Sequence, residues 1–118
     1  MGLISEGKPI PMYGDGTSER DYTFVRDTVR AVLLSAASDI KYDVINIGGG
    51  SPITLCGLIE KLQEVMQRET GIEQLPEQSG DMPRTFADIA KAQRLLGWAP
   101  EVSLADGLRE FVQWKLAT

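Results

Sequence analysis

The chain has 118 residues, of which 42% are apolar and 25% charged, and 12 Lys and Arg against 17 Asp and Glu give a net charge of -5. These values exclude a disordered, collagen-like or membrane-spanning chain, and the length predicts one compact unit over residues 1–118. The sequence holds no histidine, which excludes histidine zinc sites, Ser-His or Cys-His nucleophile pairs and an imidazole base. The acidic balance argues against nucleic acid or a membrane as partner, so a phosphate-bearing ligand needs a local site of fixed arginines.

The cysteine content and the N-terminal residues predict a cytoplasmic protein. Cys56 is the only cysteine and has no partner for an internal disulfide, which favours a reducing compartment. With no histidine to activate it, Cys56 is predicted to be a small core residue and not a nucleophile. Residues 1–10 lack the apolar h-region of a signal peptide, and no carboxylate cluster has the spacing of a metal loop.

The first half of the chain predicts a hairpin, a helix and a strand. Residues 9–13 and 20–25 are strand-like runs on either side of a glycine-containing turn, which predicts a β-hairpin. Asp27 is the predicted N-cap of a helix that ends near Ser38. Residues 42–47 have the apolar character of a strand covered on both faces of a parallel sheet. The chain offers few other strands, so this run is expected to pair with neighbours from elsewhere.

The second half predicts three helices and one short strand, at residues 72–75. The order of elements predicts an α/β fold, mixed α+β in isolation, with a small mixed sheet and about four helices. Each helix has a capping residue before it, and the first two have a stop signal after them. They run from Thr54 to Gly71, from Asp88 to Gly97, and from Ser103 onwards.

Three segments are candidates for chemistry. Gly48, Gly49 and Gly50 lie between a strand and a helix as in a phosphate cradle, but neither G-x-x-x-x-G-K-[ST] nor G-x-G-x-x-G is present, so a tight turn is favoured. On a strand, Arg20 would share a face with Tyr22, and such a pair either grips a phosphate or is a surface arginine beside core aromatics. On spacing alone those two interpretations stay open. The loop at residues 78–84 adds a further carboxylate and arginine.

In order along the chain, these segments resemble the C-terminal part of the NAD-dependent nucleotide-sugar epimerases and dehydratases of the extended short-chain dehydrogenase/reductase family. The chain is most similar to the UDP-glucuronate and UDP-glucose 4-epimerases, and the resemblance covers nearly all of it. Each motif is weak alone, whereas the ordered set is specific. The matching runs are Gly7 to Gly16, Arg20 to Asp27, Val44 to Gly50, Gly80 to Pro83, Ala87 to Ala92, Leu96 to Pro100, Val102 to Leu104 and Gly107 to Trp114.

The resemblance implies a partial Rossmann-type epimerase fold without its cofactor domain, and a set of residues that bind a UDP-sugar. It implies that the strand through Pro11 and Tyr13 lies along the uracil and that Arg20 contacts the diphosphate. It also implies that Tyr22 borders the nucleotide and that Asp81 approaches the ribose or the sugar. Gln78 stands where some relatives carry an arginine to the phosphate, a contact for which Arg84 is the candidate substitute. The run 42–47 would join the sheet of the cofactor domain.

The family's glycine fingerprint for NAD and its Tyr-x-x-x-Lys pair do not occur in this sequence. In the intact family, NAD takes a hydride from the sugar and returns it to the other face, with the tyrosine as the acid-base group. The chain alone is therefore expected to hold no cofactor, no metal and no catalytic residue, and to be inert. Two hypotheses remain: a UDP-sugar-binding portion completed by the missing Rossmann domain, or a free-standing remnant that assembles as a homodimer.

Overall fold

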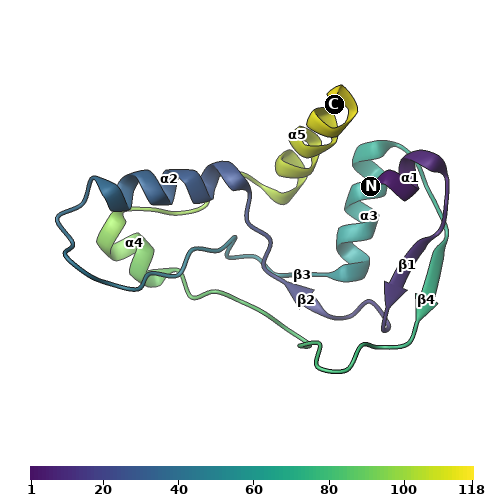
Figure 1. The fold of residues 1–118 in the computed structure, drawn as a ribbon, viewed down its shortest axis with the longest axis horizontal. Helices are drawn as coiled ribbons and strands as arrows, with labels where there is room; N and C mark the ends of the chain where they lie inside the picture. Colours follow the sequence, from purple (N-terminus) through teal and green to yellow (C-terminus); the bar gives the residue numbers. More distant parts are fainter.

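Five helices and four short strands make up the computed structural model, which describes residues 1–118 (Figure 1). The mixture of helices with parallel and antiparallel strands confirms the predicted fold class, although the strands form two separate two-stranded sheets. The first helix was not expected from the sequence. In chain order the elements are α1 (Gly2–Glu6), β1 (Ile10–Tyr13), β2 (Glu19–Arg20), α2 (Val25–Ala36), β3 (Ile53–Thr54), α3 (Leu55–Met66), β4 (Ile72–Leu75), α4 (Ala90–Leu96) and α5 (Leu104–Ala117).

The predicted hairpin between residues 9–13 and 20–25 is wrong. β1 pairs in parallel with β4, from Ile10 beside Ile72 to Tyr13 beside Leu75, and β2 pairs antiparallel with β3. After β1 the chain does not turn back, because the carbonyls of Gly16 and Ser18 accept hydrogen bonds from the start of α3. These bonds hold the segment after β1 against the N-terminus of α3, which places β2 beside β3.

Helix α2 begins two residues earlier than Asp27, so residues 22–25 are not a strand and Asp27 is not the N-cap. Phe24 occupies the N-cap position. Asp27 is 2% exposed, and its Oδ2 accepts hydrogen bonds from the N–H groups of Glu101 and Val102 at 3.1 and 3.0 Å. The indole N–H of Trp98 donates to the Asp27 carbonyl at 2.9 Å. Asp27 therefore ties α2 to the turn that precedes α5.

Local capping signals place α3, α5 and the end of α4. Asp88 is not the N-cap of α4, as predicted, because Ile89 takes that position, although the Asp88 Oδ1 accepts from the Ala90 N–H at 2.9 Å. The hydroxyl of Thr54 accepts from the Gly57 N–H at 3.1 Å, and the Ser103 hydroxyl accepts from the Asp106 N–H at the same distance, as both predicted caps require. Gly97 ends α4 in the left-handed region, with φ 61°. Helix α3 ends at Met66 and not near Gly71.

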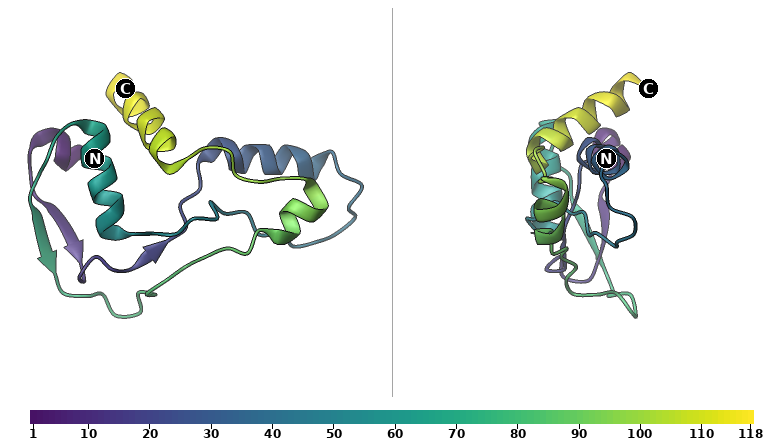
Figure 2. Two further views of the ribbon diagram at one scale, coloured as in Figure 1. Left: turned by 180° about the vertical axis from the view of Figure 1, so that it is seen from behind. Right: turned by 90° about the vertical axis from the view of Figure 1, so that its left-hand side faces the viewer.

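The chain is flatter and longer than its length predicts. Its extents are 50 × 36 × 18 Å and its radius of gyration is 16.7 Å, whereas a compact domain of this length has roughly 13.5 Å. One end holds α1, α3, β1 and β4, and the other holds α2 and α4 (Figures 1 and 2). The exposed surface is 7982 Å², against roughly 6300 Å² for a compact protein of this mass. The expectation of one compact unit is therefore not met.

The run 42–47 reaches the surface without a strand beside it. No backbone–backbone hydrogen bond joins it to the rest of the chain, and Figure 1 draws it as an extended segment. Ile45 and Ile47 pack against a small core of Ala31, Ala92 and Trp98, whereas Val44 is 70% exposed. The run therefore has one covered face, one open face and no sheet.

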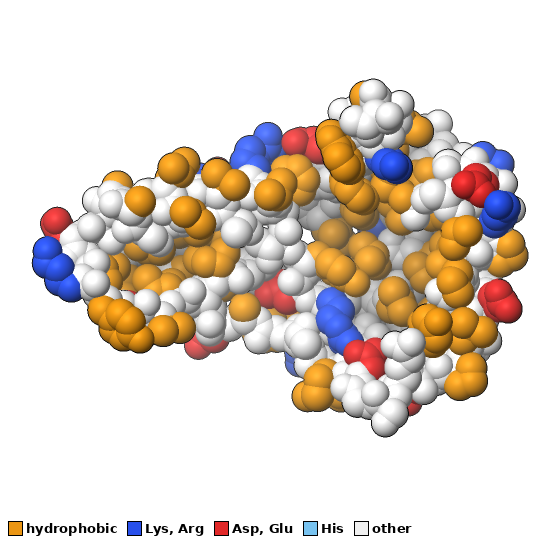
Figure 3. Space-filling model, viewed as in Figure 1, with side chains coloured by type: hydrophobic (Ala, Val, Ile, Leu, Met, Phe, Trp, Pro, Cys, Tyr) orange, Lys and Arg blue, Asp and Glu red, His pale blue; other side chains and the backbone are white.

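Helix α2 carries an apolar stripe that faces solvent. The stripe consists of Val25, Val29, Val32 and Leu33, each more than half exposed. Hydrophobic side chains lie along the arm that holds α2 and α4 (Figure 3).

None of the helices is long and apolar enough to cross a membrane.

Candidate functional site

The parallel pairing of β1 and β4 brings two distant loops to the same end of the molecule. Parallel strands end at the same edge of a sheet, and the Gly14 N–H donates to the Leu75 carbonyl at 3.0 Å as both strands finish. The loop after β1 leads to Arg20, and the loop after β4 carries Gln78 and Asp81. There the Arg20 Nη2 lies 2.5 Å from the Asp81 Oδ1. The structure thus joins two of the predicted site residues.

Residues 83–85 run along β2 and fix the loop that carries Asp81. The Glu19 N–H donates to the Pro83 carbonyl at 2.8 Å, and the Thr85 N–H donates to the Glu19 carbonyl at 3.1 Å. The Arg84 Nε lies 2.9 Å from the Glu19 carboxylate. Successive strand residues point to opposite faces, so Arg84 lies on the face of Glu19 and not on that of Arg20. This arrangement argues against Arg84 as a substitute phosphate ligand.

Pro11 and Tyr13 share the exposed face of β1. Met12, between them, is buried and has its Sδ 3.9 Å from the Sγ of Cys56. Tyr13 is 47% exposed, and Pro11 is exposed beside it. This strand therefore alternates with a period of two, whereas the strand face predicted to hold both Arg20 and Tyr22 does not form, because β2 ends at Arg20. Cys56 is a half-buried packing residue.

The other two predicted site residues are Tyr22 and Gln78. Tyr22 lies beyond the end of β2 and is 41% exposed. Gln78 is exposed, and its side chain makes no hydrogen bond in the structure. The Asp81 N–H donates to the Gln78 carbonyl at 3.2 Å, but no side-chain hydrogen bond or ion pair links Tyr22 or Gln78 to Arg20 or Asp81. The candidate site is thus an open surface around the Arg20–Asp81 pair.

The sequence analysis missed Asp21, which organises this end of β2. Its Oδ1 accepts from the Ser51 N–H at 3.3 Å and its Oδ2 from the Ala87 N–H at 3.4 Å. A Cβ at Gly49 would lie 2.2 Å from the Tyr22 carbonyl oxygen, so the glycine run is a close approach of two chain segments. The favoured turn interpretation therefore fits. The sequence offered one signal for Asp21: it is a carboxylate that lies between Arg20 and Tyr22, two residues already predicted to bind the ligand.

The arginines of the candidate site are already neutralised by carboxylates. Arg20 is paired with Asp81, and Arg84 with Glu19. Asp15 lies in the loop between β1 and β2, where hydrogen bonds from the Thr17 hydroxyl and N–H lower the pKa of its carboxyl. Because each arginine is matched by a carboxylate, the surface is a poor site for a bare anion.

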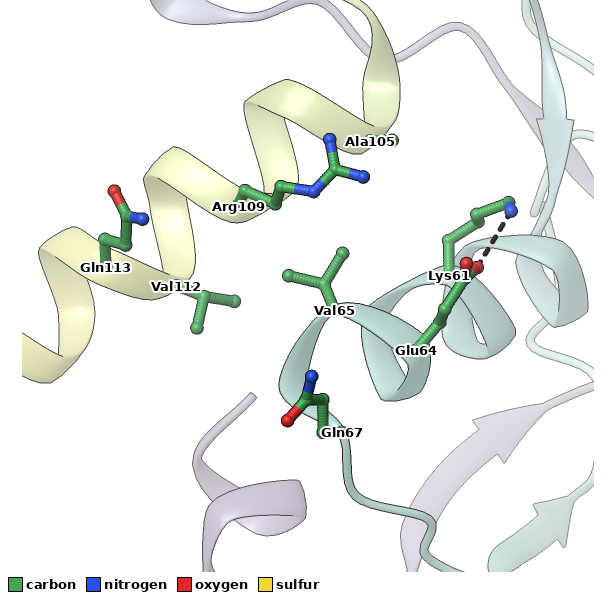
Figure 4. A pocket seen from close by; sticks show the side chains of 8 residues that line it. All are labelled: Lys61, Glu64, Val65, Gln67, Ala105, Arg109, Val112 and Gln113. Atoms are coloured by element: carbon green, nitrogen blue, oxygen red, sulfur yellow. Dashed lines mark hydrogen bonds and ion pairs between the residues drawn. The ribbon is translucent and has the colours of Figure 1, made fainter.

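Two hollows lie on the side of the molecule that α5 covers. A groove of about 930 Å³ runs from Tyr22 to α3 and α5 and ends at Phe111 and Trp114, whose rings stack with centroids 5.8 Å apart. A pocket of about 510 Å³ lies between α3 and α5 (Figure 4). In it Lys61 turns towards Glu64, with 2.9 Å between Nζ and Oε2. No predicted site residue lines this pocket.

No group of three or more His, Cys, Asp or Glu side chains is arranged to hold a metal ion. Nor do the residues present fit a dinucleotide. The turn at residues 48–50 would have to present free N–H groups, but the Tyr22 carbonyl lies against Gly49 and the Ser51 N–H is taken by Asp21. The arrangement can bind a ligand through the Arg20 guanidinium, the Asp81 carboxylate and the exposed face of β1.

Comparison with known proteins identifies the family. The family model for GDP-mannose 4,6 dehydratase matches residues 1–111. The chain belongs to this family. It is 40% identical over 112 residues to the UDP-glucuronate 4-epimerase of Thermodesulfobacterium geofontis, a match that covers 94% of this chain and 34% of the relative. It is 36% identical over 122 residues to a dTDP-glucose 4,6-dehydratase of Neisseria gonorrhoeae, covering 93% of this chain and 35% of that relative.

Solved structures of related enzymes share the fold. UDP-glucuronic acid 4-epimerase from Bacillus cereus, in complex with UDP-glucuronic acid and NAD, aligns with a TM-score of 0.86 and 33% identity over 98% of this chain. UDP-glucose 4-epimerase from Thermotoga maritima, with UDP-glucose, aligns with a TM-score of 0.88 and 34% identity over 97% of this chain. Each match covers 38% of the solved chain. The chain therefore spans about a third of the length of the relatives it matches, and the predicted partial epimerase fold is confirmed.

Proposed function

We propose that this chain is the UDP-sugar-binding portion of an NAD-dependent sugar-nucleotide 4-epimerase. The observation that carries the proposal is the convergence of two loops, 61 residues apart, on the Arg20–Asp81 pair. Relatives with the same arrangement of elements have been solved with UDP-glucuronic acid or UDP-glucose bound, which supports a ligand of this class.

Each residue of the site has a role that its chemistry can perform. The planar guanidinium of Arg20 suits a diphosphate, and the Asp81 carboxylate accepts hydrogen bonds from ribose or sugar hydroxyls. Pro11 and Tyr13 offer an exposed strand face to the uracil, and Tyr22 borders the nucleotide. The Gln78 side chain is neutral, so Arg20 is the one cationic side chain that we expect to contact the phosphates.

This chain does not supply the groups that carry out the chemical step. In the family, NAD supplies the hydride transfer, and this chain contains neither a dinucleotide cradle nor a Tyr-x-x-x-Lys pair. We therefore expect the chain alone to bind its ligand without turning it over. The α2 stripe and the run 42–47 are the surfaces on which we expect the missing Rossmann domain to pack. The lone Cys56 supports a cytoplasmic setting for the assembled protein.

A UDP titration tests the binding proposal. Followed by calorimetry, the intact chain should bind UDP weakly, and Arg20→Ala should weaken binding by about tenfold, the value of one charge-assisted hydrogen bond. Arg26→Ala is the matched control, because Arg26 is an exposed arginine paired with Glu110 on α5. Identical curves for Arg20→Ala and the intact chain would remove the proposal.

A second candidate function, a homo-oligomeric assembly module, is favoured by the unpaired run 42–47. Extended segments outside a sheet pair with other chains, and a second copy would cover the exposed Val44 side chain, although the Val44 carbonyl already accepts from the Lys91 Nζ at 2.9 Å. The surface in excess of a compact protein, about 1700 Å² from the figures above, exceeds the roughly 800 Å² that each partner buries in a standard interface.

Light scattering at high concentration tests this candidate. A dimer that Val44→Lys converts to a monomer would support it. Leu116→Lys is the control, because Leu116 is also 70% exposed but lies on α5. A monomeric mass for the intact chain would count against the candidate and leave the run 42–47 to the missing domain.

A further inference from the structure

We infer that the ion pair between Asp43 and Lys91 is a latch that closes one edge of the run 42–47 and holds back its pairing with a second copy of the chain. The inference rests on the second candidate function, the assembly of copies through this run. It goes beyond that candidate because it names the contact that must open before two copies can pair.

The first observation is that both backbone polar groups of Val44 are already bonded. The Val44 N–H donates to the Asp43 Oδ1 at 2.7 Å, and the Val44 carbonyl accepts from the Lys91 Nζ at 2.9 Å. The Lys91 Nζ also donates to the same Asp43 oxygen at 2.6 Å. The ion pair therefore gives Val44 the acceptor and the donor that a neighbouring strand would give it.

The second observation is that the rest of this edge is open. In an extended chain, the backbone groups of alternate residues point to the same edge, so Asn46 shares an edge with Val44. The backbone groups of Asn46 make no hydrogen bond within the chain, and both side chains are exposed. Charged side chains, lysine above all, are a common means of keeping a strand edge from pairing.

A symmetric dimer would need the two backbone groups that the latch occupies. Two copies related by a two-fold axis present the same surface to each other. If their runs meet antiparallel at Val44, the two Val44 residues form a hydrogen-bonded pair that exchanges both N–H···O bonds. A backbone N–H has a single hydrogen, so each Val44 must leave Asp43 before it can donate to the other copy. Two latches therefore open for each dimer that forms.

The latch is weak enough to open. The hydrogen bonds from Lys91 and from the Val44 N–H lower the pKa of the Asp43 carboxyl, so both members of the pair are charged at neutral pH. Their side chains are 41% and 30% exposed for Lys91 and Asp43, and solvent screens the attraction. Each latch is therefore expected to change the dimer affinity about threefold, and two latches about tenfold.

Light scattering over a range of concentrations tests the inference with two variants. Lys91→Met removes the ammonium group, keeps a long side chain, and should tighten self-association about tenfold. Arg94→Met is the matched control. Arg94 also lies on α4 and attracts the Asp43 carboxylate, but it makes no hydrogen bond to the run 42–47. Its removal should leave the affinity unchanged.

Amide hydrogen exchange tests the latch in the monomer, at low concentration. Relative to the rate in a free peptide, the Val44 N–H should exchange about threefold more slowly than the Asn46 N–H in the intact chain. Asp43→Ala removes the acceptor and should abolish the difference. Equal rates for the two N–H groups in the intact chain would overturn the latch.

The possible masses separate the latch from the assembly candidate. A dimer for Lys91→Met beside a monomer or a weaker dimer for the intact chain would support the latch. Equal affinities for these two chains, or equal tightening in Arg94→Met, would overturn the latch and leave the assembly candidate standing. Monomers at every concentration for all three chains would overturn both. UDP binding tests the UDP-sugar proposal separately, because Asp43 and Lys91 lie outside the Arg20–Asp81 site.

Discussion

The guanidinium of Arg20 and the carboxylate of Asp81, which lie 61 residues apart in the chain, are in direct contact at 2.5 Å. The pair joins the end of β2 to the loop after β4, beside the backbone hydrogen bonds that hold residues 83–85 against β2. Because both side chains are partly exposed, solvent screens the attraction, and its contribution to stability is small.

A double-mutant cycle should measure this contact directly. Arg20→Ala, Asp81→Ala and the double variant, compared by urea unfolding, should give a coupling free energy of about 0.5 kcal/mol at low salt. The coupling should shrink in 1 M salt, because the screening length there falls to about 3 Å. A coupling of zero at low salt would contradict the contact.

Asp27 should contribute far more to stability than any surface ion pair. Asp27→Ala leaves the N–H groups of Glu101 and Val102 without their acceptor and removes one of the two carboxylates paired with Arg30. The expected loss is about 3 kcal/mol of the free energy of unfolding. Urea unfolding checks it, with Asp39→Ala as the control that removes one exposed carboxylate and should change stability by less than about 0.5 kcal/mol.

The same carboxylate should make the fold sensitive to acid. Burial alone would raise the pKa of Asp27, but hydrogen bonds from the Val102 and Glu101 N–H groups and the nearby Arg30 together bring that pKa below its ordinary value. A carboxyl with a lowered pKa stabilises the folded state above about pH 4, and this contribution disappears as pH falls through the folded pKa.

As pH falls below about 4, the unfolding midpoint of the intact chain should therefore fall more steeply than that of Asp27→Asn, which has no carboxyl to titrate at this position. Equal slopes for the two chains would mean that Asp27 does not titrate as a buried, hydrogen-bonded group.

Signals local in sequence predicted local structure well. The Thr54 and Ser103 caps and the Gly97 stop were readable because each acts within four residues of itself. The alternation of exposed Pro11, buried Met12 and exposed Tyr13 is the period of two that any half-buried strand has. These features need no knowledge of the rest of the fold.

Contacts between distant segments could not be predicted in the same way. The pairing of β1 with β4 depends on α3, which lies between the two strands in sequence. The first N–H groups of α3 donate to the segment that follows β1. Asp27 has the sequence signature of an N-cap, and only the folded turn at residues 101–102 gives it a different partner. Arg20 and Asp81 were placed in one site by resemblance, and no pattern within either loop indicates that the loops meet.

The glycine run offers a last test, because backbone atoms of another segment lie against the Cβ position of Gly49. A Cβ at Gly49 would lie 2.2 Å from the Tyr22 carbonyl oxygen, which is backbone and cannot turn aside. Gly49→Ala should therefore cost about 2 kcal/mol of the free energy of unfolding and weaken UDP binding through the displaced Tyr22. Gly71→Ala is the control, since nothing lies within 4 Å of its Cβ position, and it should be neutral or slightly stabilising. Equal stabilities for the two variants, measured by urea unfolding, would contradict the close approach at Gly49.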